Sequence, residues 1–193
     1  MAKRPRIWIA AIVLLAGAAH AARVDEESPR ALSLIAGLGL AAPLRQQGQD
    51  VNGKGTGGYA AAEYIFRLTH WFTPRLYAGG IFAPPESDSC GGVVPCDVSA
   101  RILFTGAKAR LMAPIPYVGP FIELGFGVSG GRISTRSGRQ VDVTGEGLMY
   151  HVPFSLGLAI GARHQFDVAF EYLFHPEQKQ FSGAAAVGLT LDL

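Results

Sequence analysis

The stretch Phe166-Asp-Val-Ala-Phe-Glu-Tyr-Leu-Phe174 decides the fold of this chain. Large apolar or aromatic side chains occupy every even position, whereas Asp167 and Glu171 occupy odd positions. Because successive side chains of a β-strand point to opposite faces, this alternation predicts a strand with one apolar and one polar face.

The C-terminal stretch Phe181-Ser-Gly-Ala-Ala-Ala-Val-Gly-Leu-Thr-Leu-Asp-Leu193 repeats the pattern. Its apolar face carries Val187, Leu189 and Leu191, and its other face carries mostly small residues. Small side chains are what the interior of a narrow barrel requires. The two stretches together predict strands that are apolar outside and polar or small inside, which is favourable only in lipid.

Period-two apolarity recurs along the chain, and each stretch is near the length that a tilted strand needs to cross a bilayer. The predicted strands cover about 31–42, 57–68, 75–83, 99–112, 117–128, 147–162, 164–174 and 181–193.

The connections between these strands alternate in length. Short turns follow the second, fourth and sixth strands, and longer polar segments, 43–56, 84–98, 129–146 and 175–180, follow the others. This alternation is typical of outer-membrane barrels, with both termini and the short turns in the periplasm. We therefore predict an all-β fold, an eight-stranded antiparallel up-and-down transmembrane β-barrel.

The first 21 residues are typical of a secretory signal peptide. Basic residues precede the apolar run 7–19, and the small-residue pattern Ala19-His20-Ala21 follows it. The run is too short to span a bilayer as a helix. We expect a signal peptide at 1–21, one barrel domain at 22–193, and export to the outer membrane of a Gram-negative cell.

Two cysteines, Cys90 and Cys96, lie in the second long connection. In an exported protein this spacing predicts a disulfide, worth roughly 2 kcal/mol. A redox or metal role is the alternative, but a zinc site needs further Cys or His nearby. We expect neither a bound metal nor a cofactor.

With this architecture, the sequence resembles the OmpA/OmpX-type family of small eight-stranded outer-membrane proteins. Its most specific local element is Gly188–Leu193, which is similar to the terminal signal read by the barrel-assembly machinery. Leu193 stands where an aromatic residue is usual, and Ala186 where a polar one is usual. The resemblance implies outer-membrane lipid as the surroundings and the assembly machinery as a partner during insertion. We expect a monomer.

The interior of an eight-stranded barrel is only wide enough for side chains, so we predict no open diffusion pore. Charges on the predicted inner faces form a mixed set that would survive burial only if paired. Its members are Glu63, Arg67, Lys108, Arg110, Glu123, Asp167 and Glu171. We interpret them as a rigidifying salt-bridge network; an ion gate that exchanges partners is the alternative.

The sequence does not decide which face of the fourth predicted strand points inward. If Lys108 points inward, Phe104 on the same face does too, unless Gly106 marks a bulge. Aromatic residues near the predicted strand ends, including Trp71, Tyr77 and Tyr117, suit interfacial girdles.

The histidines do not form a catalytic or metal-binding pattern. His151 and Ser155 share one face of the sixth strand but lie four residues apart, too far for a direct hydrogen bond. We expect both to fill the lumen, and His70, His164 and His175 to be solvated or interfacial. The chain lacks a phosphate loop and a basic aromatic surface, so we expect no nucleic-acid partner.

The long connections contain the residues that we expect to make contacts at the cell surface. Arg132, Arg136 and Arg139 could bind lipopolysaccharide phosphates, or equally be solvated charges. We predict a non-enzymatic outer-membrane barrel with a structural or surface-interaction role. The alternatives are a lipid A-modifying barrel enzyme and a soluble exported barrel that binds a small apolar ligand. The sequence does not identify the surface partner, nor whether the lumen conducts ions.

Overall fold

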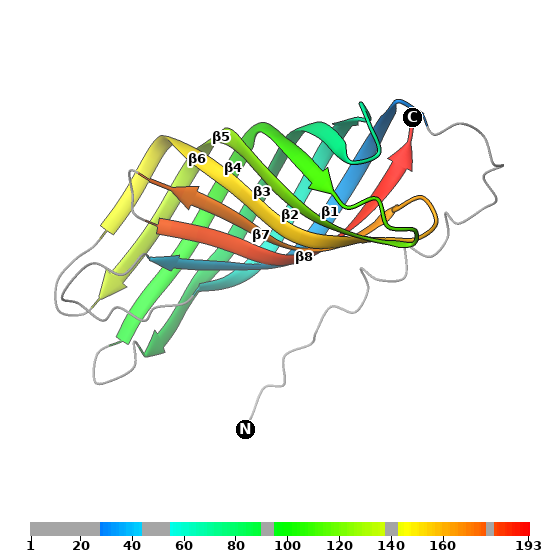
Figure 1. Ribbon diagram of the computed structural model, residues 1–193. Helices are drawn as coiled ribbons and strands as arrows, with labels where there is room; N and C mark the ends of the chain where they lie inside the picture. Colours follow the sequence, from blue (N-terminus) through cyan, green and yellow to red (C-terminus); the bar gives the residue numbers. More distant parts are fainter. Residues whose placement is uncertain (1–27, 44–54, 90–94, 138–142, 177–179) are drawn as a thin grey trace, which may run out of the picture.

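The chain folds into a closed barrel of eight antiparallel strands in the computed structural model, which describes residues 28–43, 55–89, 95–137, 143–176 and 180–193 (Figure 1). The strands are β1 (Arg30–Pro43), β2 (Gly55–Phe66), β3 (Phe72–Ser89), β4 (Pro95–Met112), β5 (Val118–Ser137), β6 (Val143–Ile160), β7 (Phe166–His175) and β8 (Gln180–Asp192). The predicted signal peptide and Cys90 lie outside the described residues.

Each strand pairs with its neighbours in sequence, and β1 pairs with β8 to close the barrel. The closing register runs from Ala31 opposite Asp192 to Pro43 opposite Gln180. The predicted eight-stranded, up-and-down, antiparallel fold is therefore confirmed. The C-terminal end of β8 lies at the same end of the barrel as the short turns (Figure 1).

Two of the predicted long connections are largely strand. β3 continues to Ser89 and pairs with β4 from Pro95, while β5 continues to Ser137 and pairs with β6 from Val143. The predicted loops 84–98 and 129–146 were wrong in extent. The alternation of polarity weakens there because the sequence of 84–89 and 132–137 is mostly polar or proline at odd and even positions alike. In β3 the register shifts between Ala83 and Glu86, across two prolines that cannot donate to the ladder.

The outer wall of the barrel is apolar. Leu103 is 74% exposed, Leu148 79% and Phe170 57%, and Phe166 and Phe174 point outward with Phe170. The inner wall instead carries buried charges. This is the reverse of a soluble barrel, so the apolar-ligand alternative is wrong, and the wall fits a lipid environment. No helix in the described part of the chain could cross a membrane.

In strand β4, Ile102, Phe104, Lys108 and Arg110 all face inward. Its register with β3 and β5 is continuous through Gly106, so there is no bulge at that position. This regular register places the charges of β4 in the lumen.

Tyr77 is 5% exposed and lies inside the barrel, so its predicted interfacial position was wrong. Its ring has room because Gly127 across the lumen lacks a side chain: a Cβ there would overlap the Tyr77 hydroxyl and the His151 ring. Trp71 and Tyr117 are exposed at the short-turn end, as expected of interfacial aromatics.

Candidate functional site in the barrel interior

The lumen contains a buried charge cluster, which we define as Glu63, Arg75, Lys108, Arg110, Glu123, Asp167 and Glu171. An apolar group of Phe121, Ala159 and Ala169 lies on its short-turn side. On the other side, toward the long hairpins, lies a larger apolar group that includes Ile81 and Ile102. Apolar side chains therefore cover the charge cluster toward the long hairpins and pack against part of it on the short-turn side.

Lys108 of β4 lies at the centre of the charge cluster. Its Nζ is 2.6 Å from Glu63 Oε1, 2.5 Å from Glu123 Oε2 and 3.4 Å from Glu171 Oε2. Oxygens of these three carboxylates lie within 4.8 Å of one another, a separation at which a cation is needed. The lysine ammonium supplies that positive charge from within the chain.

Arg110, two residues after Lys108 on the same face of β4, binds two carboxylates. Its Nε donates to Glu123 Oε1 at 2.6 Å, and its Nη1 and Nη2 donate to the two oxygens of Asp167 at 3.0 and 2.7 Å. This bidentate arrangement fixes the planar guanidinium. The guanidinium carbon lies 3.5 Å from the centre of the Phe121 ring, so the apolar group packs directly against the cluster.

Arg75 completes the cluster and was not among the predicted members. Its Nη1 is 2.8 Å from Glu63 Oε2 and 3.6 Å from Glu123 Oε1. The sequence did contain evidence for it. Arg75 and Tyr77 lie on one face of the predicted strand 75–83, and a charged side chain on a lipid-embedded strand is favourable only on the lumen face. Because Tyr77 was assigned to the membrane interface, Arg75 on the same face was not assigned to the lumen.

Arg67 does not join the cluster, which corrects its predicted place. It follows the last residue of β2, and its Nη1 donates to Asp192 Oδ1 at 2.6 Å and to the Ser28 carbonyl at 3.0 Å. The alternation that pointed it inward ends with the strand, so Arg67 lies at the mouth of the barrel instead. The structure brings the other six predicted members together.

The charge cluster holds three cations and four carboxylates among the described residues, and every one of these side chains is at most 6% exposed. Glu171 also accepts a hydrogen bond from the Ser155 hydroxyl at 2.5 Å. Breaking one buried pair leaves an uncompensated charge, so the members depend on one another. Because they come from β2, β3, β4, β5 and β7, they brace the barrel across its interior.

A second buried network contains Tyr77, Ser129, His151 and His175. Distances are 2.6 Å from Tyr77 Oη to His151 Nε2, 2.7 Å from His151 Nδ1 to Ser129 Oγ, and 3.1 Å from Ser129 Oγ to His175 Nε2. With neutral imidazoles each group donates to the next, from Tyr77 to His175. His175 is fully buried, so its predicted solvated or interfacial position was wrong. Cross-strand register, which the sequence does not display, brings the four together.

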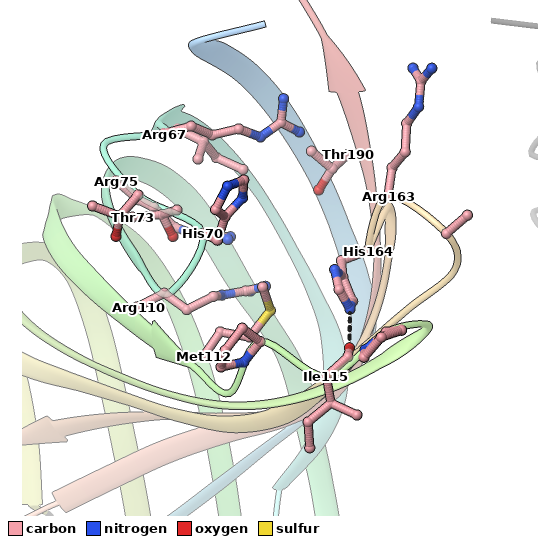
Figure 2. Close-up of a pocket in the computed structure, with 15 residues that line it drawn as sticks. Arg67, His70, Thr73, Arg75, Arg110, Met112, Ile115, Arg163, His164 and Thr190 are labelled. Atoms are coloured by element: carbon pink, nitrogen blue, oxygen red, sulfur yellow. Dashed lines mark hydrogen bonds between the residues drawn. The ribbon is translucent and has the colours of Figure 1, made fainter. Parts of the chain in front are cut away.

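The short-turn end of the barrel opens into a pocket of about 280 Å³ (Figure 2). Turn residues His70 and His164 line it, together with Arg67, Arg75 and Arg110. His164 Nε2 lies 2.9 Å from the Ile115 carbonyl, which joins the β6–β7 turn to the β4–β5 turn. The floor of the pocket is the basic edge of the charge cluster.

The residues predicted to contact lipopolysaccharide lie on or beyond β5. Arg132 is exposed on the outer wall, directly opposite Arg101 of β4 and Glu146 of β6. Arg136 is the register partner of Asp97, and Arg139 lies outside the described residues. The Cys90–Cys96 disulfide stays a prediction, because Cys90 is also outside them.

No protein-family model and no curated protein matches this sequence. Among solved structures, the chain is similar to the neisserial surface protein A, with 12% identity and a TM-score of 0.60 over 88% of this chain and 100% of that one. It is also similar to the attachment invasion locus protein Ail of Yersinia pestis, solved with the heparin analogue sucrose octasulfate, with 13% identity and a TM-score of 0.50 over 84% and 99%. Both are small eight-stranded outer-membrane barrels, so the fold that the sequence resemblance implied is confirmed.

Proposed function

We propose that this barrel is an integral outer-membrane protein without an open diffusion pore, whose working part is the pair of hairpins that project from its long-loop end. One observation carries the proposal: β5 and β6 stay paired beyond Arg132, as far as Thr135 opposite Val143. Residues 132–137 alone extend about 20 Å along the strand. A membrane anchor alone does not require hairpins of this length.

The filled interior supports an anchoring rather than a transporting role. The charge cluster and the apolar groups packed against it occupy the lumen with side chains that are almost completely buried. A solute would have to separate several buried ion pairs at once, each of which costs a few kcal/mol to break. Liposomes that contain the protein should therefore not swell in sugar solutions, and rapid swelling would contradict the proposal.

A non-enzymatic role is supported by the position of the nucleophile candidates. Ser129 and His151 are within hydrogen-bond distance, as a nucleophile and base would be, but both are fully buried in the lumen. A lipid-modifying enzyme needs its nucleophile on the lipid-facing wall. Ser155, which was predicted to fill the lumen, donates to Glu171 and also points inward.

At the outward end, the arginines favour contact with the phosphates of lipopolysaccharide. Arg101 and Arg132 are exposed register partners on the outer wall, Arg136 follows further along β5, and Arg139 comes three residues later in the sequence. Guanidinium groups bind phosphate through paired hydrogen bonds. The proposed partner is therefore the lipopolysaccharide that surrounds the barrel.

Trimmed hairpins test this proposal. Replacing 88–96 by Asn-Gly joins the paired residues Ser87 and Asp97, and replacing 136–142 joins Thr135 and Val143 in the same way. The trimmed barrel should still be carbonate-resistant and migrate faster unheated than boiled. In phosphatidylcholine vesicles, added lipopolysaccharide should raise the thermal stability of the full chain more than that of the trimmed chain, which keeps Arg101 and Arg132 but loses Arg136 and Arg139. An equal gain in both would remove the hairpins as the contact, and failure of the trimmed chain to fold would show that they belong to the anchor.

A further inference from the structure

The pocket at the short-turn end has a strongly basic lining. Its 15 lining residues, all in the described part of the chain, include four arginines, two histidines and three threonines, but no Asp or Glu. Figure 2 shows Arg67 and Arg163 on either side of Thr190 at its rim. Such a lining is suited to a negatively charged ligand.

Two donors near the floor of this pocket lack acceptors within the described residues. The Arg75 Nε–H and the Thr73 hydroxyl are buried and have no hydrogen-bond partner, and the Arg75 side chain is only 5% exposed. Both residues lie on the inner face of β3, one pleat apart. A buried donor without an acceptor is costly, so a ligand with oxygen acceptors would be stabilised there.

Several carboxylates lie close to this basic lining. Asp192 lies between Arg67 and Arg163, with oxygens 2.6 and 3.6 Å from their guanidinium groups. Below them, Glu63 and Asp167 bind the Nη atoms of Arg75 and Arg110 from the lumen side. Because these acidic groups lower the positive potential, we expect affinity for a single phosphate in the millimolar range.

We propose that this mouth is a binding site for an oxyanion group, a carboxylate or a phosphate, held by Thr73, Arg75 and the rim arginines. The group has two possible sources. One is a small anion from the compartment at the short-turn end. The other is the chain itself, because Asp25-Glu26-Glu27 directly precede Ser28, whose carbonyl accepts from Arg67. Three residues reach about 10 Å, and such a short tether gives a high effective concentration.

Titration of the refolded mature barrel in detergent with inorganic phosphate tests the site, with calorimetry as the readout. Thr73→Val and Arg163→Gln should each weaken binding roughly ten- to hundredfold, since each removes a hydrogen bond to a charged group. Tyr150→Phe, which removes one exposed hydroxyl from the outer wall outside the pocket, should leave binding unchanged. The difference in gel mobility between unheated and boiled samples confirms that each variant is folded.

A chain with Asp25→Asn, Glu26→Gln and Glu27→Gln distinguishes the sources. Phosphate binding by the native sequence identifies a site open to free anions. Binding only after neutralisation identifies the chain's own carboxylates as the occupant, and also supports the site. Absence of binding in both chains, or binding that neither Thr73→Val nor Arg163→Gln weakens, would overturn the proposal.

Discussion

Substitution of Lys108 by methionine tests whether the charge cluster stabilises the barrel as a mutually dependent unit. Methionine has a similar length and removes only the charge and its donors. The change leaves Glu171 without a cation within 4 Å among the described residues, because Lys108 is its only ion-pair partner there. Glu63 and Glu123 keep Arg75 and Arg110.

The size of the effect follows from the distances. At an effective dielectric constant of about 20, charges 2.5 to 2.6 Å apart attract by about 6 kcal/mol. Lys108 makes two such contacts, and the cost of burying its ammonium offsets much of the gain. Removal of one partner from a buried group of this kind costs about 3–5 kcal/mol, a large part of the stability of a typical domain.

Trp71 provides the assay, since it is the one tryptophan that would remain after removal of 1–21 and is exposed at the short-turn end. Its fluorescence during urea unfolding from vesicles gives the free energy of unfolding for the native chain, Lys108→Met, and Lys108→Met with Glu171→Gln. The double variant should recover about 1–2 kcal/mol, because it removes the stranded carboxylate. A single variant within about 0.5 kcal/mol of the native chain, or a double variant no more stable than the single, would refute the reasoning.

Three further predictions concern other parts of the barrel. Gly127→Ala should lower the free energy of unfolding by about 1–3 kcal/mol, because its methyl would meet Tyr77 and His151, whereas Gly130→Ala, which meets open space, should have little effect in the same unfolding assay. Phe170→Arg should reduce stability in vesicles by about 2–4 kcal/mol, since this side chain faces lipid, and an unchanged folding yield would contradict the assigned faces. Reduction of the predicted Cys90–Cys96 disulfide should cost roughly 2 kcal/mol, and free thiols that react in the native unreduced protein would exclude the bond.

The transmembrane part of the fold could be predicted from the sequence because lipid and lumen impose opposite polarities on alternate residues. The stretch Phe166–Phe174 displays this directly, and its register in the structure follows the prediction. Near the ends of β3 and β5 the sequence is mostly polar at odd and even positions alike, so the alternation disappears and these ends were predicted too short. Periodicity identifies a strand only where its two faces have different surroundings.

The candidate site was less predictable, since its contacts join residues far apart in sequence. The alternation of polarity was enough to predict that Lys108 and Glu123 face the lumen. The hydrogen bonds of Ser129 with His151 and His175, by contrast, depend on the stagger between β5, β6 and β7. Arg67 was predicted wrongly for a different reason. Its odd position in the alternation of β2 predicts an inward side chain, but β2 ends one residue earlier, at Phe66. The alternation of odd and even positions predicts which face of the sheet a side chain is on. Which side chains touch depends on the register between strands and on where each strand ends.

The distribution of the cluster over the strands has a consequence for the order of assembly. A β3–β4 hairpin entering lipid by itself would carry Arg75, Lys108 and Arg110 without a single acidic partner from the cluster, because the carboxylates belong to β2, β5 and β7. Unpaired charges of this kind oppose insertion strongly. The seam between β1 and β8, by contrast, joins mostly small and apolar residues such as Gly37 and Ala186. We therefore expect the sheet to curl and pair its charges before it is fully embedded, with the β1–β8 seam, in which Asp192 is the one charged residue of the described register, closing last.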